Sequence, residues 1–441
     1  MKEKESIKEI FKGKKWGSIL MAVAMWVTLS IPTQSVEAAE NIKVNAFVKL
    51  LVTELKLQID TSLEEPYVEA AKVAGIIKEG EFNQYTGYLT RTDLAVLANR
   101  ADEYLNGDKI DNKLLSCVLE KRISDIKKVA AEKREAVAKV FAKGIIKGYS
   151  NGYYIQNRSF KGNGYVTTSA AKEVISLVKD PNKRAKISPD GQLIRTTNLP
   201  KYAKYYPYIL ESFPNRYYDW KFGYEGQNKV NPRTGEKIPY VYLEEYASPK
   251  DIDKITDFDH FKLVKEENLD SWVQKVKTYT ECVFNADYRT INDEWVNKLL
   301  ASDYSNGHDN LNKQEKGYIQ QYIKEMKSNK TIVESSKIAL DGSSLYYYRG
   351  RYVLRVYVKY RILSSAVEYG ANAETLIMQN PYGKLLYTRY PIVNLNKYSL
   401  GKWKEAYYEI ELGWYDTKNP NNIGVCFGIW DELLYDKRRV D

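Results

Sequence analysis

The arginine at the start of one helical segment is the residue best suited to bind a ligand. The stretch Thr90-Arg91-Thr92-Asp93 leads into an apolar helical pattern, and a threonine followed three residues later by an acid forms a capping box. That cap accounts for Thr90 and Asp93 but not for Arg91. A guanidinium group is planar and always charged, and it forms paired hydrogen bonds with carboxylates or sugar hydroxyls. Arg91 is therefore either a plain surface residue or a ligand contact.

Other residue patterns that could support catalysis or hold a metal are weak. Glu409 and Glu411 alternate along one apolar-rich segment and share a face, as paired acids of a glycosidase would, but an exposed strand has the same pattern. The stretch DFDHF, with Asp257, Asp259 and His260, fits a solvated helix start better than a metal site. The sequence contains no HExxH motif, P-loop, nucleophile elbow or dinucleotide fingerprint. We therefore expect no cofactor, no metal and no catalytic residue.

The length and composition are those of an ordinary globular protein with several domains. A chain of 441 residues is too long for one core and indicates two or three domains. Its 67 basic and 57 acidic residues are interspersed, which argues against a nucleic-acid partner and favours weak attraction to an anionic polymer. The three cysteines are far apart, so local spacing predicts no disulfide framework, and a Cys282–Cys426 bridge stays open.

The first 39 residues have the features of a secretory signal peptide. A lysine-rich leader is followed by an apolar run over 18–31, which is shorter than the roughly 20 residues that span a membrane. The small-residue pattern Val36-Glu37-Ala38 then predicts cleavage after Ala38 or Ala39. No later stretch is apolar enough to span a bilayer. We expect an exported protein without membrane attachment after cleavage.

Two similar segments indicate an internal helical repeat. AKVAGIIK at 71–78 and AKVFAKGIIK at 138–147 each end an amphipathic helix at a glycine, and a polar loop and a second helix follow. An unpaired second helix at 42–57 precedes both copies. Units of this kind need stacked neighbours to bury their apolar faces. The buried stripes of two second helices are predicted to comprise Phe47, Leu50, Leu51 and Leu55, and Leu94, Leu97, Ala98 and Leu105.

The motifs GIIKGYSNGYY, FKGN and LTRTD together resemble S-layer homology (SLH) repeats of bacterial cell-surface proteins. The resemblance covers roughly residues 41–180. In that family three repeats usually pack as a pseudo-threefold helical unit that binds a secondary cell-wall polysaccharide, often one with acidic pyruvyl groups. The resemblance therefore implies a partner of that kind and a place at the cell surface, in the wall or S-layer of a Gram-positive-type bacterium.

The same resemblance implies which residues would bind the glycan. Arg91 would face the glycan from the helix start that Thr90 and Asp93 cap. The loop positions that match the family are Gly148, Tyr149, Asn151 and Gly152, for which turn chemistry is the alternative interpretation. The first copy has Lys43-Val44-Asn45-Ala46 at the helix start and the last has Thr167-Thr168-Ser169-Ala170, so neither offers an arginine or an acid. One of three pockets keeps its arginine.

The remainder of the chain has two further parts. Residues 181–255 hold eight of the 13 prolines and many tyrosines, which predicts a connector lying over a neighbouring domain, with a stacking platform for sugars as the alternative. Residues 256–441 change from helical periodicity to strand-like segments, which predicts an α+β domain. The helices are expected at 271–284, 291–302 and 313–327, and the strands at 343–350, 351–363, 374–380, 384–392, 405–416 and 424–434. Alternation along 351–359 predicts a half-buried strand.

The sequence thus predicts a multidomain protein with an N-terminal, mainly α, SLH-like module at 40–180 and a C-terminal α+β domain in which an antiparallel sheet follows the helices. A curved sheet wrapping a helix, as in nuclear transport factor 2, is the expected shape by analogy alone. We expect an exported surface protein held noncovalently to wall polysaccharide, with a C-terminal domain that binds or supports without catalysis. Two alternatives stay open: a wall-tethered, glycan hydrolase-like enzyme, and repeats that serve only as a protein-contact scaffold. The sequence does not indicate the oligomeric state.

Overall fold

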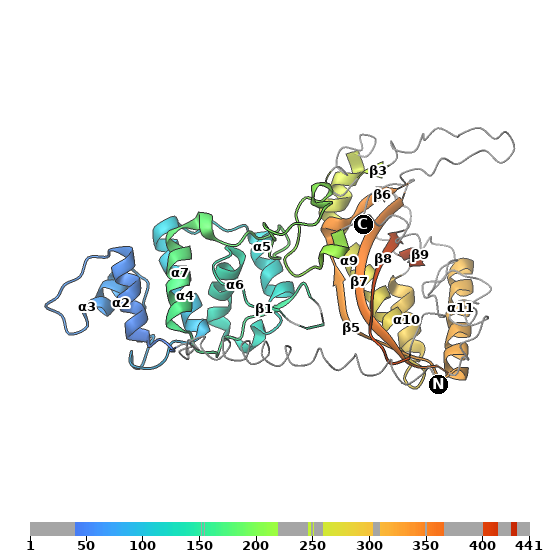
Figure 1. Ribbon diagram of the computed structural model, residues 1–441, viewed down its shortest axis with the longest axis horizontal. Coiled ribbons are helices and arrows are strands. Elements are labelled where there is room, and N and C mark those ends of the chain that lie inside the picture. Colours follow the sequence, from blue (N-terminus) through green and yellow to red (C-terminus); the bar gives the residue numbers. More distant parts are fainter. Residues whose placement is uncertain are drawn as a thin grey trace, which may run out of the picture.

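The computed structural model describes residues 40–150, 152–153, 155–218, 246–247, 250, 259–302, 309–348, 351–365, 400–412 and 425–429. The expected signal peptide and the expected strands at 374–380 and 384–392 lie outside these residues. A helical module and a C-terminal sheet domain lie next to each other along the long axis of the molecule, and the segment between them runs over the sheet (Figure 1).

The helical module surrounds a single apolar core. Phe47, Leu97, Phe141 and Ile175, from four different helices, are each at most 2% exposed within it. The longer helices are α2 (Val44–Leu55), α3 (Pro66–Val73), α4 (Arg91–Asn106), α5 (Asn112–Cys117), α6 (Arg134–Ala142) and α7 (Thr168–Lys179). Shorter turns are η1 (Val118–Arg122), η2 (Ile126–Lys128), η3 (Ala131–Lys133) and η4 (Pro181–Lys183).

Helices α3 and α6 end in the same way. Gly75 and Gly144 both adopt left-handed backbone angles, with φ of 70° and 69°. In each case the next two residues are isoleucines whose N–H groups bond to one carbonyl in the last helical turn and whose side chains are buried. The glycine therefore turns the chain so that an Ile-Ile pair enters the core.

Replacing Gly144 by Ala is expected to destabilise the module by roughly 3 kcal/mol. The left-handed conformation costs an L-residue about 1–2 kcal/mol. A Cβ at Gly144 would also overlap the carbonyl of Ala185, a clash that adds about 1–3 kcal/mol. Gly75→Ala is the matched control, because φ is nearly the same but no atom lies within 4 Å of its Cβ position. Chemical denaturation measures both; equal losses would show that the contact with Ala185 is not tight.

Three short backbone ladders join the starts of α2, α4 and α7 into a closed triangle. The N–H groups of Val44, Arg91 and Thr168 donate to the carbonyls of Gly87, Gly164 and Glu40, at 2.9, 2.8 and 3.0 Å. Isolated antiparallel bridges connect the same segments: Lys43 with Tyr88, Thr90 with Tyr165, and Asn41 with Thr167. Val44, Arg91 and Thr168 therefore occupy equivalent positions, and only one of the three is an arginine.

The predicted buried stripes are confirmed for most of their residues and are wrong for Leu105. Phe47, Leu51, Leu94, Leu97 and Ala98 are buried. Leu50 and Leu55 are only partly buried. Leu105 was expected in the core but is 41% exposed, because the buried place in that turn of α4 belongs to Asp102, which is 1% exposed.

The proline- and tyrosine-rich segment packs on the sheet, as expected of a connector that covers a neighbouring domain. It includes η5 (Ala203–Tyr205) and α8 (Asn215–Tyr218). Its buried side chains Leu210, Tyr217 and Tyr218 form a cluster with Tyr357 and Tyr407 of the sheet. Tyr217 donates its hydroxyl to the carbonyl of Arg355 at 2.9 Å. The aromatic rings in the described part of the connector therefore serve largely as packing.

The C-terminal domain is α+β, with its longer helices before an antiparallel sheet. The helices are α9 (Asp259–Phe284), α10 (Asp293–Ser302) and α11 (Asp309–Ser328), followed by the turn η8 (Gly342–Ser344). The strands are β3 (Tyr246–Ala247), β4 (Ala286–Asp287), β5 (Ile332–Leu340), β6 (Tyr346–Tyr348), β7 (Arg351–Ser364), β8 (Lys404–Leu412) and β9 (Val425–Ile429). β7 is central and pairs with β5, β6 and β8, while β9 extends the sheet beyond β8.

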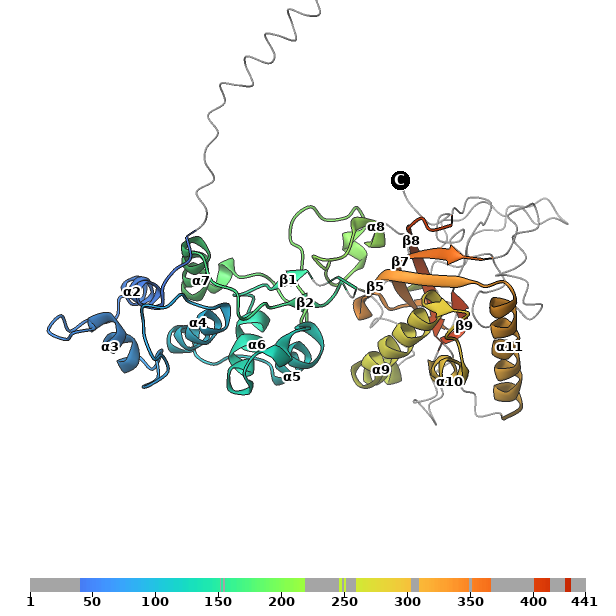
Figure 2. The ribbon, with the colours of Figure 1, turned by 90° about the horizontal axis from the view of Figure 1, so that it is seen from below.

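Strand β7 is buried on both faces, so the prediction of a half-buried strand was wrong. Leu354, Val356 and Val358 point to the core shared with Trp272 of α9. Tyr357 points the other way, into the connector cluster. Figure 2 shows the reason: helices α9, α10 and α11 lie on one side of the sheet and the connector with α8 lies on the other.

Candidate functional site

Thr90 and Asp93 form the expected helix cap. The N–H of Asp93 donates to Thr90 Oγ1 at 3.1 Å, and the Thr90 hydroxyl donates to Asp93 Oδ2 at 2.7 Å. The other carboxylate oxygen of Asp93 accepts from Lys133 Nζ at 2.8 Å. Both side chains are therefore engaged within the module and hold the start of α4, which leaves Arg91 as the group free for another role.

The side chain of Arg91 lies between two aromatic rings. Its guanidinium carbon is 4.8 Å from the centre of the Tyr149 ring and 5.2 Å from that of Phe160. Its Nε donates to the carbonyl of Phe160 at 2.9 Å. Within the part of the chain that the structure describes, the two terminal nitrogens make no hydrogen bond. Burial lowers the pKa of this guanidinium, but an arginine keeps its charge at every physiological pH. A charged, stacked fork with unused donors is therefore available to a ligand.

The loop after α6 brings the second group of predicted residues to Arg91. Gly148 has a φ of 40°, which favours glycine there, and the next residue is Tyr149. β1 (Tyr149–Ser150) pairs with β2 (Arg158–Ser159) as a short hairpin. Lys161 Nζ lies 4.6 Å from the centre of the Tyr149 ring. Tyr149 thus belongs to the site and Gly148 shapes the turn, whereas Asn151 lies outside the described residues.

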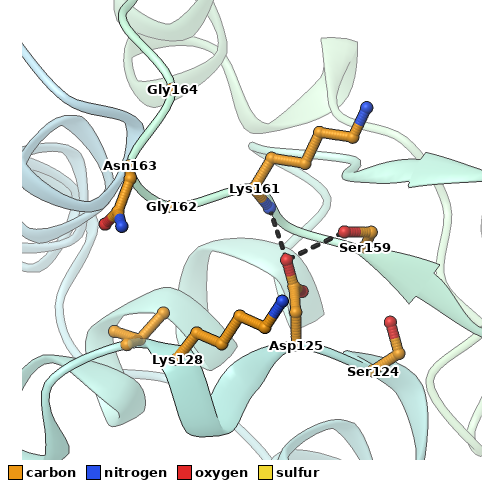
Figure 3. Close-up of a pocket in the computed structure, with 9 residues that line it drawn as sticks. Ser124, Asp125, Lys128, Ser159, Lys161, Gly162, Asn163 and Gly164 are labelled. Carbon is orange, nitrogen blue, oxygen red and sulfur yellow. Dashed lines mark hydrogen bonds between the residues drawn. The ribbon is translucent and has the colours of Figure 1, made fainter.

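A solvent-open hollow of about 540 Å³ lies next to Arg91. One wall is the segment 124–129, which contains η2 and includes Asp125 and Lys128, and the other is the loop 159–164 (Figure 3). Exposed polar groups at its rim include Lys128, Lys161 and Asn163. Arg91 adjoins this wall, since a Cβ on Gly164 would be 3.7 Å from the Arg91 Cδ. Two cationic side chains, Lys128 and Lys161, therefore line a space large enough for a sugar, and Arg91 lies beside its Gly164 wall.

Asp125 fixes the wall of the hollow and was not predicted. Its carboxylate accepts from the N–H groups of Phe160 and Lys161 at 2.7 and 2.9 Å, and from the Ser159 hydroxyl at 2.8 Å. Partial burial raises the pKa of this carboxyl, but these three hydrogen bonds outweigh the burial and hold the pKa below its ordinary value. Asp125 thus anchors Phe160, which stacks on Arg91, and Lys161, which lies over the Tyr149 ring.

The stability of the module should therefore fall in acid partly through Asp125. Because the pKa is lower in the folded protein, the stabilisation is complete above the ordinary pKa of 3.8 and is lost as the pH falls through the lowered value. We expect the melting temperature to drop between about pH 5 and pH 2. Asp125→Asn should melt lower than wild type near neutral pH, and the difference should shrink in acid. A difference that is constant with pH would contradict this role of the carboxylate.

Of the other residues named from the sequence, Asp259, His260, Glu409 and Glu411 belong to the C-terminal domain. Asp259 and His260 begin α9, while Asp257 lies outside the described residues. Among the described residues no group of three or more His, Cys, Asp or Glu could hold a metal ion. Glu409 and Glu411 lie on β8, opposite Arg355 and Val353 of β7.

Cys282 is a free, buried thiol, so it is not bridged to Cys426. No helix within the described ranges is both long and apolar enough to cross a bilayer.

Comparison with known families identifies the unit that carries the hairpin. The family model of the S-layer homology domain matches residues 122–167, the segment from Asp125 and α6 through the hairpin to the cap of α7. The chain is therefore an S-layer homology domain-containing protein, a class that generally anchors proteins to cell-wall polysaccharide at the cell surface. No curated protein matches the chain.

Proposed function

We propose that this protein is exported and held noncovalently to an acidic secondary cell-wall polysaccharide, which it binds at Arg91. The observation that carries the proposal is the stacked guanidinium of Arg91, with two unused nitrogens beside an open hollow. Lys128 and Lys161 add positive charge at the rim. Such a site suits a sugar bearing a carboxylate, because the fork binds the carboxylate and the Tyr149 ring offers a flat surface.

One binding site per chain follows from the triangle of helix starts. The positions equivalent to Arg91 are Val44 and Thr168, which cannot form a paired hydrogen bond to a carboxylate. The module is in this sense a degenerate set of SLH repeats over 40–180. Without a second site the chain gains no avidity, so its attachment should be weaker than that of a module with several intact sites.

The C-terminal domain is proposed to act as a binding or structural domain rather than as an enzyme. The signal peptide at 1–39 would export the chain, and the module would present the C-terminal domain at the wall of a Gram-positive-type cell. Cleavage of the signal peptide would leave Ala39 or Glu40 as the first residue of the mature protein.

Sedimentation with purified wall sacculi tests the proposal. The full-length chain should sediment with intact sacculi and should stay in solution when their secondary polysaccharide has been extracted. Free polysaccharide should compete, and raised salt should weaken binding because the contact is partly ionic. Equal sedimentation with extracted sacculi would mean that the protein binds peptidoglycan or another wall component instead.

A further inference from the structure

The β1–β2 hairpin connects the Arg91 site with the C-terminal domain. At its base Tyr149 and Phe160 enclose the guanidinium of Arg91. At its tip Tyr153 and Ile155 leave the helical module and contact strand β5. Tyr153 follows Tyr149 by only four positions, at most about 14 Å of extended chain. A displacement of the tip is therefore close enough to move the base.

Tyr153 is bound to the C-terminal domain through both its backbone and its hydroxyl. The N–H of Ile338 donates to the Tyr153 carbonyl at 2.9 Å. The hydroxyl shares a hydrogen bond with Ser335 Oγ at 2.8 Å and accepts from Asn285 Nδ2 at 2.8 Å. Asn285 Oδ1 in turn accepts from the N–H of Ser335 at 2.9 Å. The hydroxyl thus closes a network between β5 and the end of α9.

Ile155 secures the same tip by apolar packing. It is 7% exposed and belongs to the cluster of connector and sheet side chains that includes Leu210, Ala339 and Tyr357. The tip is therefore packed among residues of the connector and of the sheet, although it belongs to the loop that the SLH family model matches.

The base of the hairpin is attached to the helical module instead. Arg158 Nη2 donates to the carbonyl of Gly148 at 2.8 Å, and the N–H of Ser124 donates to the carbonyl of Arg158 at 2.9 Å. Asp125 binds the neighbouring N–H groups of Phe160 and Lys161. The two strands at the base are paired, Tyr149 with Ser159 and Ser150 with Arg158, so a displacement of one strand also displaces the other.

We propose that the C-terminal domain sets the geometry of the Arg91 site, with Tyr153 and Ile155 as positioning residues. Docking of the tip holds Tyr149 over the guanidinium and keeps the hollow in its binding shape. As far as the ligand is concerned, this inference rests on the function proposed above. Because coupling between two equilibria is reciprocal, polysaccharide bound at Arg91 also tightens the contact between Tyr153 and β5.

The test uses the full-length chain with Tyr153→Ala, Tyr153→Phe and Ile155→Ala. Amide hydrogen exchange at 149–150 and 160–161 should be about tenfold faster in Tyr153→Ala and Ile155→Ala. Tyr153→Phe keeps the ring and the backbone bond, so its exchange rates should lie between those of wild type and Tyr153→Ala. Affinity for extracted wall polysaccharide should fall about fivefold in the two alanine variants.

Lys121→Ala is the matched control, because it removes a contact between the same two domains that involves no residue of the hairpin, the 2.8 Å ion pair with Asp270. It should change neither exchange at the base nor affinity. Saturating polysaccharide should slow exchange of the Ile338 amide in wild type, which a purely structural role of Tyr153 would not produce.

The outcomes separate the positioning role from the function on which it rests. If wild type binds polysaccharide but the Tyr153 and Ile155 variants bind equally well and exchange normally at the base, the positioning role is wrong. If wild type binds no polysaccharide, the proposed function fails, and exchange at 149–150 and 160–161 alone decides the coupling. Unchanged exchange there in Tyr153→Ala and Ile155→Ala overturns it.

Discussion

Asp102→Ala is expected to lower the free energy of unfolding of the helical module by about 3–5 kcal/mol. Asp102 is 1% exposed and accepts from Lys143 Nζ at 2.9 Å and from Asn106 Nδ2 at 2.8 Å. It also forms an ion pair with Arg184. The side chains of Lys143 and Arg184 are only 7% and 11% exposed, so removal of the carboxylate leaves two cations without enough solvent to compensate.

The loss should be large because Asp102 joins three parts of the module. It belongs to α4, Lys143 follows α6, and Arg184 follows α7. Chemical denaturation followed by circular dichroism measures the loss. Glu54→Ala is the control, because it removes an ion pair with Lys179 that is largely in solvent and should leave the transition nearly unchanged. Similar midpoints for both variants would show that the buried ion pairs do not hold the helices together.

The buried acid shows where a periodic pattern is a poor guide. Apolar spacing correctly placed Leu94, Leu97 and Ala98 in the core. The same spacing also predicted that Leu105 is buried, because hydrophobicity alone cannot show that an acid will meet two cations from distant segments. Lys143 and Arg184 are 41 and 82 residues from Asp102 in the chain. Only the packed helices bring the three charges together.

The candidate site was predictable where it depends on a local motif. The capped helix start, Arg91 and Tyr149 were named from their sequence patterns, and the structure brings Arg91 and Tyr149 together. Asp125 belongs to no local motif, because its partners are 34–36 residues away. The FKGN segment at 160–163 was one of the motifs that resemble SLH repeats. Only the folded hairpin shows that Phe160 stacks on Arg91 and that Lys161 lies over Tyr149.

The sheet was predictable in class but not in its surroundings. The helices α9, α10 and α11 and the strands β7, β8 and β9 match the expected order. Strand β5 was missed because its middle, Glu334 to Lys337, is polar and partly exposed. The burial of both faces of β7 depends on the docked connector. The residue pattern of β7 itself does not indicate that docking.

Arg91→Ala is expected to weaken binding of acidic wall polysaccharide by roughly ten- to a hundredfold. A hydrogen bond to a charged group contributes about 1.5–3 kcal/mol, and about 1.4 kcal/mol corresponds to a tenfold change in affinity. Arg91→Lys should recover part of the loss, since it keeps the charge but not the planar fork. The fold should also lose a little stability, because the Nε bond to Phe160 and the stacking on Tyr149 disappear with the side chain.

Thr90→Ala separates an effect on the fold from an effect on the ligand. It removes the cap of α4 and should cost about 1 kcal/mol of stability. It leaves the guanidinium in place, so its effect on affinity should be small and should follow only from the loosened helix start. If Thr90→Ala and Arg91→Ala weakened binding equally, the helix start and not the arginine would be responsible.

Calorimetric titration of the full-length protein with extracted wall polysaccharide tests the central claim most directly. Wild type should bind one glycan per chain, since Arg91 is the single arginine among the three equivalent helix starts. Arg91→Ala should bind the polysaccharide at least about tenfold more weakly than wild type. Its melting temperature should be close to that of Thr90→Ala. Equal affinities of wild type and Arg91→Ala would mean that Arg91 is a surface residue and that the polysaccharide binds elsewhere.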